Sequence, residues 1–172
     1  PFRGVTRREG RRLHGHAGWG EAAPFWNYDD LESSRWLAAA LESARRFPPV
    51  PRRKFVPVNV TIPVISPEEA YERVKASGGC ATAKIKVAEP GVSVGRDCAR
   101  IAAVADALRE TVGGQAMIRL DANGAWEVDQ AREAIPAMAS AARVVPIEHV
   151  EQPCLTEDEL AQVRRSVAGP IA

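Results

Sequence analysis

The stretch Thr-Ala-Lys-Ile-Lys-Val at residues 82–87 predicts a short strand that carries two lysines on one side. Side chains alternate between the two faces of a strand, so Lys84 and Lys86 point the same way. Two ammonium groups on one face of an apolar strand are costly if that face belongs to a hydrophobic core. They are reasonable if the face lines an active site, and the rest of the chain must then supply their partners.

The overall composition is that of an ordinary globular protein. The chain has 172 residues, of which 45% are hydrophobic and 26% charged, with a net charge of +1, so neither nucleic acid nor a membrane surface is expected as a partner. No apolar run approaches the roughly 20 residues of a transmembrane helix, and the N-terminus lacks the apolar core of a signal peptide. Cys80, Cys98 and Cys154 show no C-x-x-C spacing, which argues against a disulfide framework or a zinc site and favours a cytoplasmic location.

From Phe55 onward, predicted strands and helices alternate. The strands are residues 55–64, 82–87, 116–120 and 144–151, and residues 170–172 open a fifth. The helices are 66–78, 97–109, 127–142 and 156–167, of which the third contains Pro136. Capping boxes mark two of the helix starts: Ser66 with Glu69, and Thr156 with Glu159.

The spacing of the strands indicates a parallel α/β architecture. Thirty-five residues separate Lys86 from Asp121, and 30 separate Asp121 from Glu151, as expected for strands joined by crossover helices. A doubly wound sheet would show a Gly-rich phosphate turn after its first strand, and none is present. A TIM-like barrel instead places polar chemistry at the C-terminal ends of its strands. A full barrel needs roughly 250 residues, so residues 55–172 predict its first half.

Residues 1–54 differ in composition and pattern from the rest of the chain and predict part of a small α+β domain. Five arginines between Arg3 and Arg12 suggest an exposed strand or hairpin edge. The Gly- and aromatic-rich residues 15–28 predict a loop, which either covers a site or packs on the domain below it. Asp29-Asp30 predicts the start of a helix running to about Arg46, and the Pro-rich residues 47–51 predict a linker.

Two carboxylates follow the lysine pair at successive strand ends. Asp121 and Glu151 would converge at the mouth of a barrel, where a hard cation such as Mg²⁺ takes oxygen ligands. Each is weak evidence alone, because Asp-Ala-Asn-Gly at 121–124 also favours a turn and Glu-Gln-Pro at 151–153 also suits a strand exit. The joint pattern Lys-x-Lys, Asp-x-Asn and Glu-Gln-Pro is much more specific.

With these motifs the chain resembles the muconate-lactonizing-enzyme subgroup of the enolase superfamily, and within it the actinobacterial o-succinylbenzoate synthases of menaquinone biosynthesis. The matching blocks run almost from end to end: residues 2–10, 18–21, 56–59, 83–89, 119–126 and 150–154. The resemblance implies that residues 55–172 form the first half, four βα units, of a (β/α)7β TIM-like barrel. Part of a small α+β capping domain over residues 1–54 precedes it.

The resemblance also implies roles for the polar residues. Lys86 corresponds to the base, and Lys84 holds the substrate carboxylate and tunes its neighbour. Asp121 and Glu151 correspond to the first two ligands of Mg²⁺, for which Mn²⁺ is an alternative. The third ligand and the lysine of the opposite face would fall beyond Ala172, so we expect these 172 residues to be inactive alone.

Four further residues are expected to contact or support the substrate. Asn123 and Arg119 line or support the site, while Trp19 and Phe25 belong to a loop, residues 18–28, that closes over a small carboxylate. Glu148 lies three residues from Glu151 and is interpreted as structural or supporting.

Lysine can act as a base only if its pKa, near ~10.4 in model peptides, falls to roughly 7–8. Ammonium groups two strand positions apart lie about 6–7 Å from each other. At an effective dielectric constant of ~20 their repulsion is on the order of 2–2.5 kcal/mol, equivalent to between one and two pKa units. A nearby Mg²⁺ and burial act in the same direction, so the required shift is attainable.

The implied reaction is dehydration of 2-succinyl-6-hydroxy-2,4-cyclohexadiene-1-carboxylate to o-succinylbenzoate. Lys86 removes the proton α to the carboxylate, the metal stabilises the enediolate, and loss of the β-hydroxyl gives the aromatic ring. An N-acylamino acid racemase or dipeptide epimerase of the same subgroup, or a non-catalytic remnant, are the alternatives. The sequence predicts no oligomeric state.

Overall fold

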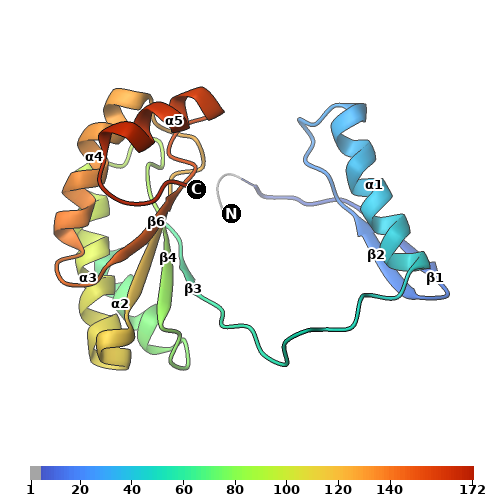
Figure 1. The fold of residues 1–172 in the computed structure, drawn as a ribbon, viewed down its shortest axis with the longest axis horizontal. Helices are drawn as coiled ribbons and strands as arrows, with labels where there is room; N and C mark the ends of the chain where they lie inside the picture. The colour runs from blue at the N-terminus through green and yellow to red at the C-terminus, as the bar shows by residue number, and fades with distance from the viewer. Residues whose placement is uncertain (1–4) are drawn as a thin grey trace. The chain divides into compact units, whose positions relative to one another are not determined.

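The structure is a computed structural model that describes residues 5–172 (Figure 1). The chain divides into two compact units, Pro1–Val56 and Pro57–Ala172, which are described separately. The boundary predicted after residue 54 lies two residues before Val56. Of the arginine-rich segment, Arg3 lies outside the described residues.

The smaller unit consists of an antiparallel hairpin and one helix. Strand β1 (Arg11–Gly15) pairs with β2 (Gly18–Ala22), and α1 (Asp30–Arg45) packs against them. The side chain of Asp29 accepts a hydrogen bond from the Glu32 amide at 2.7 Å, which caps the first turn. The helix predicted from Asp29-Asp30 is therefore confirmed.

The prediction that residues 15–28 form a loop was wrong for its first part, because Gly18–Ala22 is a strand. Glycine has no β-strand preference of its own, but here it allows the hairpin to lie very close to α1. A Cβ atom at Gly20 would lie 1.9 Å from the carbonyl oxygen of Ala40, and one at Gly15 would lie 2.2 Å from that of Ala44. Tertiary packing, not local propensity, therefore determines this strand.

Residues 46–59, which span the boundary between the two units, contain no helix or strand. Their large apolar side chains are exposed: Phe47, Val50, Phe55, Val56 and Val58. The strand predicted over residues 55–64 is therefore too long. Only β3 (Val60–Ile62) pairs with the next strand of the sheet. Residues 55–59 are β-branched and apolar in part, but they have no partner strand in the described part of the chain.

The larger unit is a parallel sheet with helices on one face, as Figure 1 shows. The strand order is β3-β4-β5-β6, and each step passes through a helix, which confirms the predicted α/β architecture. The elements after β3 are α2 (Pro67–Lys75), β4 (Thr82–Lys86), α3 (Val94–Val112), the 3-10 turn η1 (Gly113–Gln115), β5 (Met117–Asp121), α4 (Val128–Ala141), β6 (Ile147–Glu151) and α5 (Glu157–Ser166). Ile171 then bridges to Val150 in parallel orientation, where a fifth strand was predicted to open.

Both predicted capping boxes are confirmed, at Ser66 for α2 and at Thr156 for α5. Helix α3 is longer than the predicted range of 97–109 at both ends, and Ser93 caps its first turn. Helix α4 continues through Pro136. That residue is exposed, so the carbonyl group left without its helical partner lies on the solvent side.

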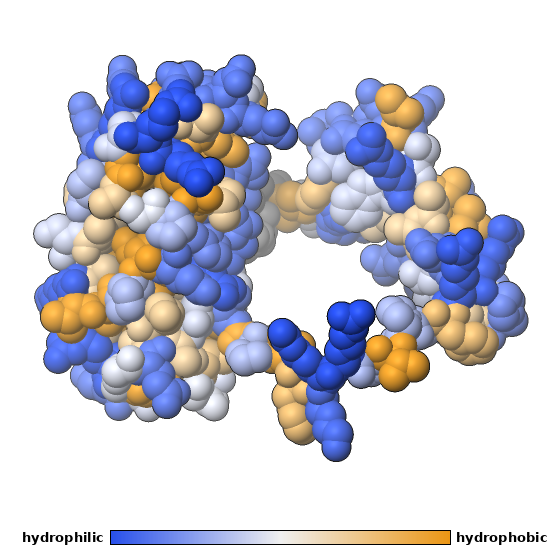
Figure 2. Space-filling view, viewed as in Figure 1, coloured by the Kyte–Doolittle hydropathy of each residue, from blue (hydrophilic) through white to orange (hydrophobic). Residues whose placement is uncertain are grey.

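The hydrophobic core lies between the sheet and its helices. Ile85, Ile118 and Leu120 are fully buried on the helix-facing side of β4 and β5, and Ile101 and Leu108 of α3 join the same cluster. Because strand side chains alternate, the other face of these strands carries the polar residues. On the face seen in Figure 2, hydrophobic residues of this unit are scattered among hydrophilic ones. Within residues 5–172, no helix combines the length and apolar character needed to cross a membrane.

Candidate active site

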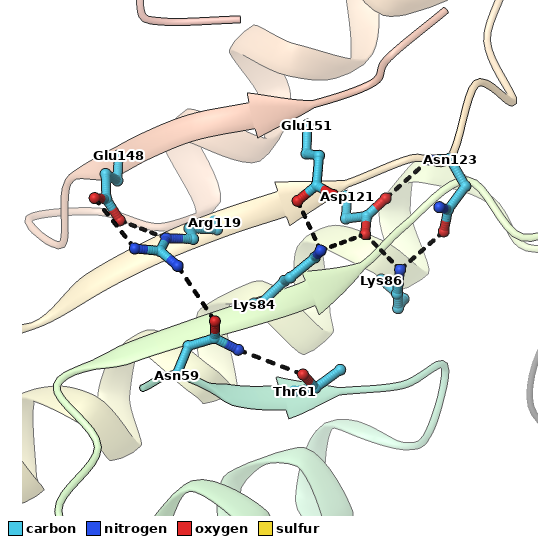
Figure 3. A network of polar contacts seen from close by, with 9 residues as sticks. All are labelled: Asn59, Thr61, Lys84, Lys86, Arg119, Asp121, Asn123, Glu148 and Glu151. Carbon is cyan, nitrogen blue, oxygen red and sulfur yellow. Dashed lines mark hydrogen bonds and ion pairs between the residues drawn. The ribbon is translucent and has the colours of Figure 1, made fainter. Parts of the chain in front are cut away.

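The polar residues predicted from the sequence lie at one end of the sheet. Lys86, Asp121 and Glu151 are the last residues of β4, β5 and β6, and the strand register aligns Lys86 with Asp121 and Asp121 with Glu151. Lys84, two residues before Lys86, shares their face. In Figure 3 these side chains come from three neighbouring strands and point toward one another. The C-terminal edge of a parallel α/β sheet is where ligand sites of such folds are built.

The Lys84 ammonium group lies between the two carboxylates. Its Nζ is 2.9 Å from Oδ2 of Asp121 and 2.7 Å from Oε2 of Glu151. The Lys86 ammonium group also donates to Asp121, and it lies 2.9 Å from Oδ1 of Asn123. The Asp121 side chain is only 1% exposed, against 23% for Lys84 and 38% for Glu151. Asp121 is therefore the buried centre of the cluster, and Lys84 and Glu151 form its more accessible side.

Asn123 reaches the cluster through a turn after β5. Its backbone adopts a left-handed conformation with φ of 52°, which asparagine tolerates better than most residues. Its amide N–H donates to Oδ1 of Asp121 at 3.0 Å, while its side-chain oxygen accepts from Lys86. The Asp-x-Asn motif thus folds back on itself and holds Lys86 from a second side.

The carboxylates, rather than lysine–lysine repulsion, dominate the electrostatics at Lys84. Burial lowers the pKa of Lys84, but hydrogen bonds to Glu151 and Asp121 outweigh this effect and the pKa is raised overall. Burial likewise raises the pKa of Asp121, and the hydrogen bonds from Lys86 and Lys84 outweigh it, so the pKa is lowered overall. The repulsion argument from the sequence concerns the lysine expected to act as the base, Lys86, and it stays a prediction.

Arg119 lies on the same face, one alternation before Asp121, and has its own partners. Its Nε donates to Oε2 of Glu148 at 2.6 Å, and its Nη1 donates to Oδ1 of Asn59 at 3.2 Å. Glu148 would be expected on the opposite face from Glu151, but an irregular register between β5 and β6 lets it reach Arg119. The hydrogen bond from Arg119 lowers the pKa of Glu148. This arrangement fits a supporting position for Arg119 beneath the lysine pair.

The donor set suits a hard cation in part. Asp121 and Glu151 supply carboxylate oxygens, which Mg²⁺ prefers, and both already converge on one positive charge, that of Lys84. Among residues 5–172 there is no group of three or more His, Cys, Asp or Glu placed to hold a metal ion. The described residues thus fit two ligands of a magnesium site.

The two aromatic residues predicted to contact substrate belong to the smaller unit. Trp19 lies on β2 with its ring 4.6 Å from that of His14, and Phe25 follows β2 beneath the guanidinium of Arg8, 4.2 Å away. The smaller unit is a separate compact unit, so the structure does not test a contact of Trp19 or Phe25 with the substrate. Their role remains a prediction.

Two buried charges of α3 were missed by the sequence analysis. Asp97 and Arg100 are 1% and 2% exposed and contact the backbone next to Lys86. The signal was available, since both share the apolar stripe of the helix with Ile101 and Val104. Charged residues at such positions are rarely fully buried unless they are paired.

Comparison with known proteins supports the same interpretation. The model of the family described as "Enolase N-terminal domain-like" matches residues 1–44, and that of "Enolase C-terminal domain-like" matches residues 67–172. Among curated proteins, an o-succinylbenzoate synthase of Thermobifida fusca is 51% identical over 171 residues, or 99% of this chain and 51% of the relative. One of Mycolicibacterium smegmatis is 45% identical over 99% of this chain and 50% of its own length. The chain therefore spans about half the length of the curated relatives it matches.

Solved structures show the same fold. A dipeptide epimerase of Enterococcus faecalis, complexed with Mg and the dipeptide L-Leu-L-Tyr, is 36% identical with a TM-score of 0.51, over 67% of this chain and 31% of that one. The L-Ala-D/L-Glu epimerase of Bacillus subtilis covers 93% of this chain and 58% of its own, with a TM-score of 0.64. At 24% identity, the latter shows the fold alone.

Proposed function

The chain belongs to the enolase superfamily, and we propose that it forms the lysine-bearing half of an o-succinylbenzoate synthase. The curated relatives of that activity match almost all of the chain at 43–51% identity. The remaining half of the barrel, which those relatives contain, completes the active site. The protein that joins residues 1–172 to that half is called the complete enzyme below.

The observation that carries this proposal is the convergence of two lysines and two carboxylates at three strand ends. Lys86 is held by Asp121 and Asn123, and Lys84 lies between Asp121 and Glu151. A purely structural sheet face would not be expected to gather three further charged groups around a carboxylate that is 1% exposed. Removal of a proton next to a carboxylate needs a base beside a positively charged environment, and this cluster supplies both.

Each residue then has a role in dehydration of 2-succinyl-6-hydroxy-2,4-cyclohexadiene-1-carboxylate. Lys86, in its neutral form, takes the proton from the carbon next to the carboxylate, while Asp121 and Asn123 orient its Nζ. The hydroxyl group leaves from the adjacent carbon as water, formed with the proton that Lys86 has taken up, and the ring becomes aromatic. Lys84 moves from its carboxylate partners to the substrate carboxylate, which its exposed side can reach.

Other proposed contacts follow the same scheme. Asp121 and Glu151 hold Mg²⁺, or Mn²⁺ in its place, together with a ligand from the second half of the barrel. When bound, this ion supplies positive charge that stabilises the negative charge developing on the substrate. Arg119 supports the substrate side of the face, and Trp19 and Phe25 cover the substrate from the smaller unit.

The test is magnesium-dependent turnover of the cyclohexadiene substrate by the complete enzyme. Lys86→Ala is expected to lower kcat by at least about 10²-fold, because a positioned base contributes about 10²–10⁴-fold. Lys75→Ala is the matched control, since this lysine pairs with Glu110 on the helical side of the unit. Unchanged circular dichroism must accompany the loss, and turnover of Lys86→Ala within about threefold of the wild type would refute the proposal.

A second candidate is epimerisation of a dipeptide, which the likeness to the Enterococcus faecalis enzyme supports. Lys86 would remove the proton α to a carboxylate, and the lysine of the opposite face, expected in the second half of the barrel, would return one from the other side, with no leaving group. Deuterium incorporation from D₂O into L-Leu-L-Tyr, without turnover of the cyclohexadiene, would favour this candidate. Absence of both reactions in the complete enzyme would favour a non-catalytic role.

A further inference from the structure

A buried ion pair lies directly behind the end of β4. Asp97 and Arg100, one turn apart on α3, contact each other and are 1% and 2% exposed. Neither residue belongs to the polar face that carries Lys84 and Lys86. Both instead approach the same strand from the helix side of the sheet.

Asp97 and Arg100 hydrogen-bond to the backbone on both sides of Val87. Nη2 of Arg100 donates a hydrogen bond to the carbonyl oxygen of Lys86 at 2.9 Å. Oδ2 of Asp97 accepts one from the amide of Ala88 at the same distance. The peptide groups that follow the Lys86 side chain are therefore fixed from α3.

The backbone at this point is not one that the local sequence favours. Ala88 has φ of 61°, a left-handed conformation that costs a residue with a Cβ roughly 1–2 kcal/mol. The preceding amide, that of Val87, donates to the carbonyl oxygen of Asp121 at 3.0 Å. The chain therefore leaves β4 in a turn that other groups must hold, and the Asp97 carboxylate holds it.

Stability alone is a poor reason for such a pair. Desolvation of two buried charges offsets most of their attraction, so an apolar replacement of both is often neutral or stabilising. Nε of Arg100 is buried and has no hydrogen-bond partner among the described residues, which adds to the cost. What the pair provides instead is two hydrogen bonds to the backbone next to Lys86.

We propose that Asp97 and Arg100 are positioning residues, which hold the end of β4 so that the Lys86 side chain meets Asp121 and Asn123 in the orientation needed for proton removal. This inference rests on the proposed role of Lys86 as the base. Misplacement of a catalytic group by about 1 Å can cost about 10²-fold in rate, which sets the scale of the effect.

The decisive comparison is between single and double replacements in the complete enzyme. Arg100→Met leaves the Asp97 carboxylate buried and unpaired, and it is expected to lower the urea midpoint strongly. Asp97→Val combined with Arg100→Met removes both charges and the acceptor of the Ala88 amide, and it is expected to restore most of that midpoint. The double variant should nevertheless keep a kcat about 10–100-fold below the wild type, with KM changed by less than about threefold.

Two further readouts separate positioning from support of the fold. A deuterium at the substrate's α-carbon should slow the double variant more than the wild type, because proton removal becomes rate-limiting. Arg100→Lys keeps a donor toward the Lys86 carbonyl and should recover part of kcat. Leu108→Ala is the control on the same helix, because this buried apolar side chain cannot hydrogen-bond to β4. It should lower stability and leave the isotope effect unchanged.

Recovery of kcat together with stability in the double variant would overturn the inference, and so would an equal loss of kcat in Leu108→Ala. A measurement independent of activity is amide hydrogen exchange at residues 86–89 of the metal-free enzyme. Exchange at Ala88 should accelerate at least about tenfold in the double variant relative to amides of β5, and unchanged exchange would refute the positioning role. If the wild type lacks both proposed activities, the proposed function fails, while the exchange result still decides the role of the pair.

Discussion

Replacing Asp121 with Asn should destabilise the larger unit severely while preserving its shape. The carboxylate of Asp121 accepts from Lys86, lies 2.9 Å from the Lys84 ammonium group, and accepts the Asn123 amide at 3.0 Å. The Asn variant keeps an oxygen for the amide but leaves two ammonium groups without a charge between them. At an effective dielectric constant of ~20, attraction across 2.9 Å is about 6 kcal/mol, before the cost of desolvation is counted. Breaking a buried pair in this way leaves a net loss of about 3–5 kcal/mol.

The assay is urea unfolding at pH 7 with EDTA present, followed by circular dichroism. With a slope of about 2 kcal/mol per molar urea, the expected loss moves the midpoint down by roughly 2 M. Asp129→Asn is the matched control, because its side chain is 87% exposed although it pairs with Arg132 at the same distance of 2.9 Å. An exposed pair of this kind contributes about 1 kcal/mol at most.

The pH dependence gives a second check on the same carboxylate. Because the pKa of Asp121 is lowered in the folded protein, its stabilisation is complete above the unfolded value, about 3.9, and is lost as the pH falls through the folded pKa. Asp121→Asn should therefore flatten the acidic limb of the stability curve. A destabilisation under about 1 kcal/mol, or an unchanged acidic limb, would refute the view that the two lysines depend on Asp121.

Three further predictions concern other parts of the chain. Burial raises the pKa of the Cys154 thiol, so a thiol reagent at pH 8 should label the partly exposed Cys80 first and Cys154 only on unfolding. Equal labelling of the two thiols in the folded protein, measured by mass spectrometry, would contradict this. Gly20→Ala should destabilise the smaller unit by about 1–3 kcal/mol, because the new methyl group overlaps α1. Thermal unfolding monitored by tryptophan fluorescence is the measurement, and an unchanged transition would argue against this packing. The hydrogen bond from Arg119 lowers the pKa of Glu148, so this pair stabilises above the unfolded value of about 4.3 and its effect fades as the pH falls through the folded pKa. Glu148→Gln should remove that dependence at a cost under about 1 kcal/mol, since both side chains are about one-third exposed, and a larger loss in urea unfolding would disprove the estimate.

Local signals in the sequence predicted much of the larger unit. The capping boxes at Ser66 and Thr156 are decided within four residues, so the sequence contains all the information needed for them. Strand spacing predicted that Lys86, Asp121 and Glu151 would share one edge, because parallel strands with regular crossovers align their ends. The structure places them there.

The failures have a common physical cause, since each depends on a distant partner. The strand predicted at residues 55–64 shrinks to Val60–Ile62 because β-branched residues form a strand only where a neighbouring strand exists. Gly18–Ala22 becomes a strand because α1 packs closely over Gly20. The raised pKa of Lys84, for which no prediction was made, depends on distant partners as well, because the two carboxylates beside it come from two other strands.

The division of the chain into two units has an evolutionary consequence. The smaller unit has its own buried alanines on the hairpin and α1, while the lysine cluster rests entirely on the sheet of the larger unit. Substitutions at sites that share no partners have nearly additive effects on stability. Under the roles proposed for Trp19 and Phe25, variation around them would change which carboxylate is accepted without disturbing the lysine cluster. Selection for a new substrate and selection for an intact reaction would then act on different stretches of the same gene.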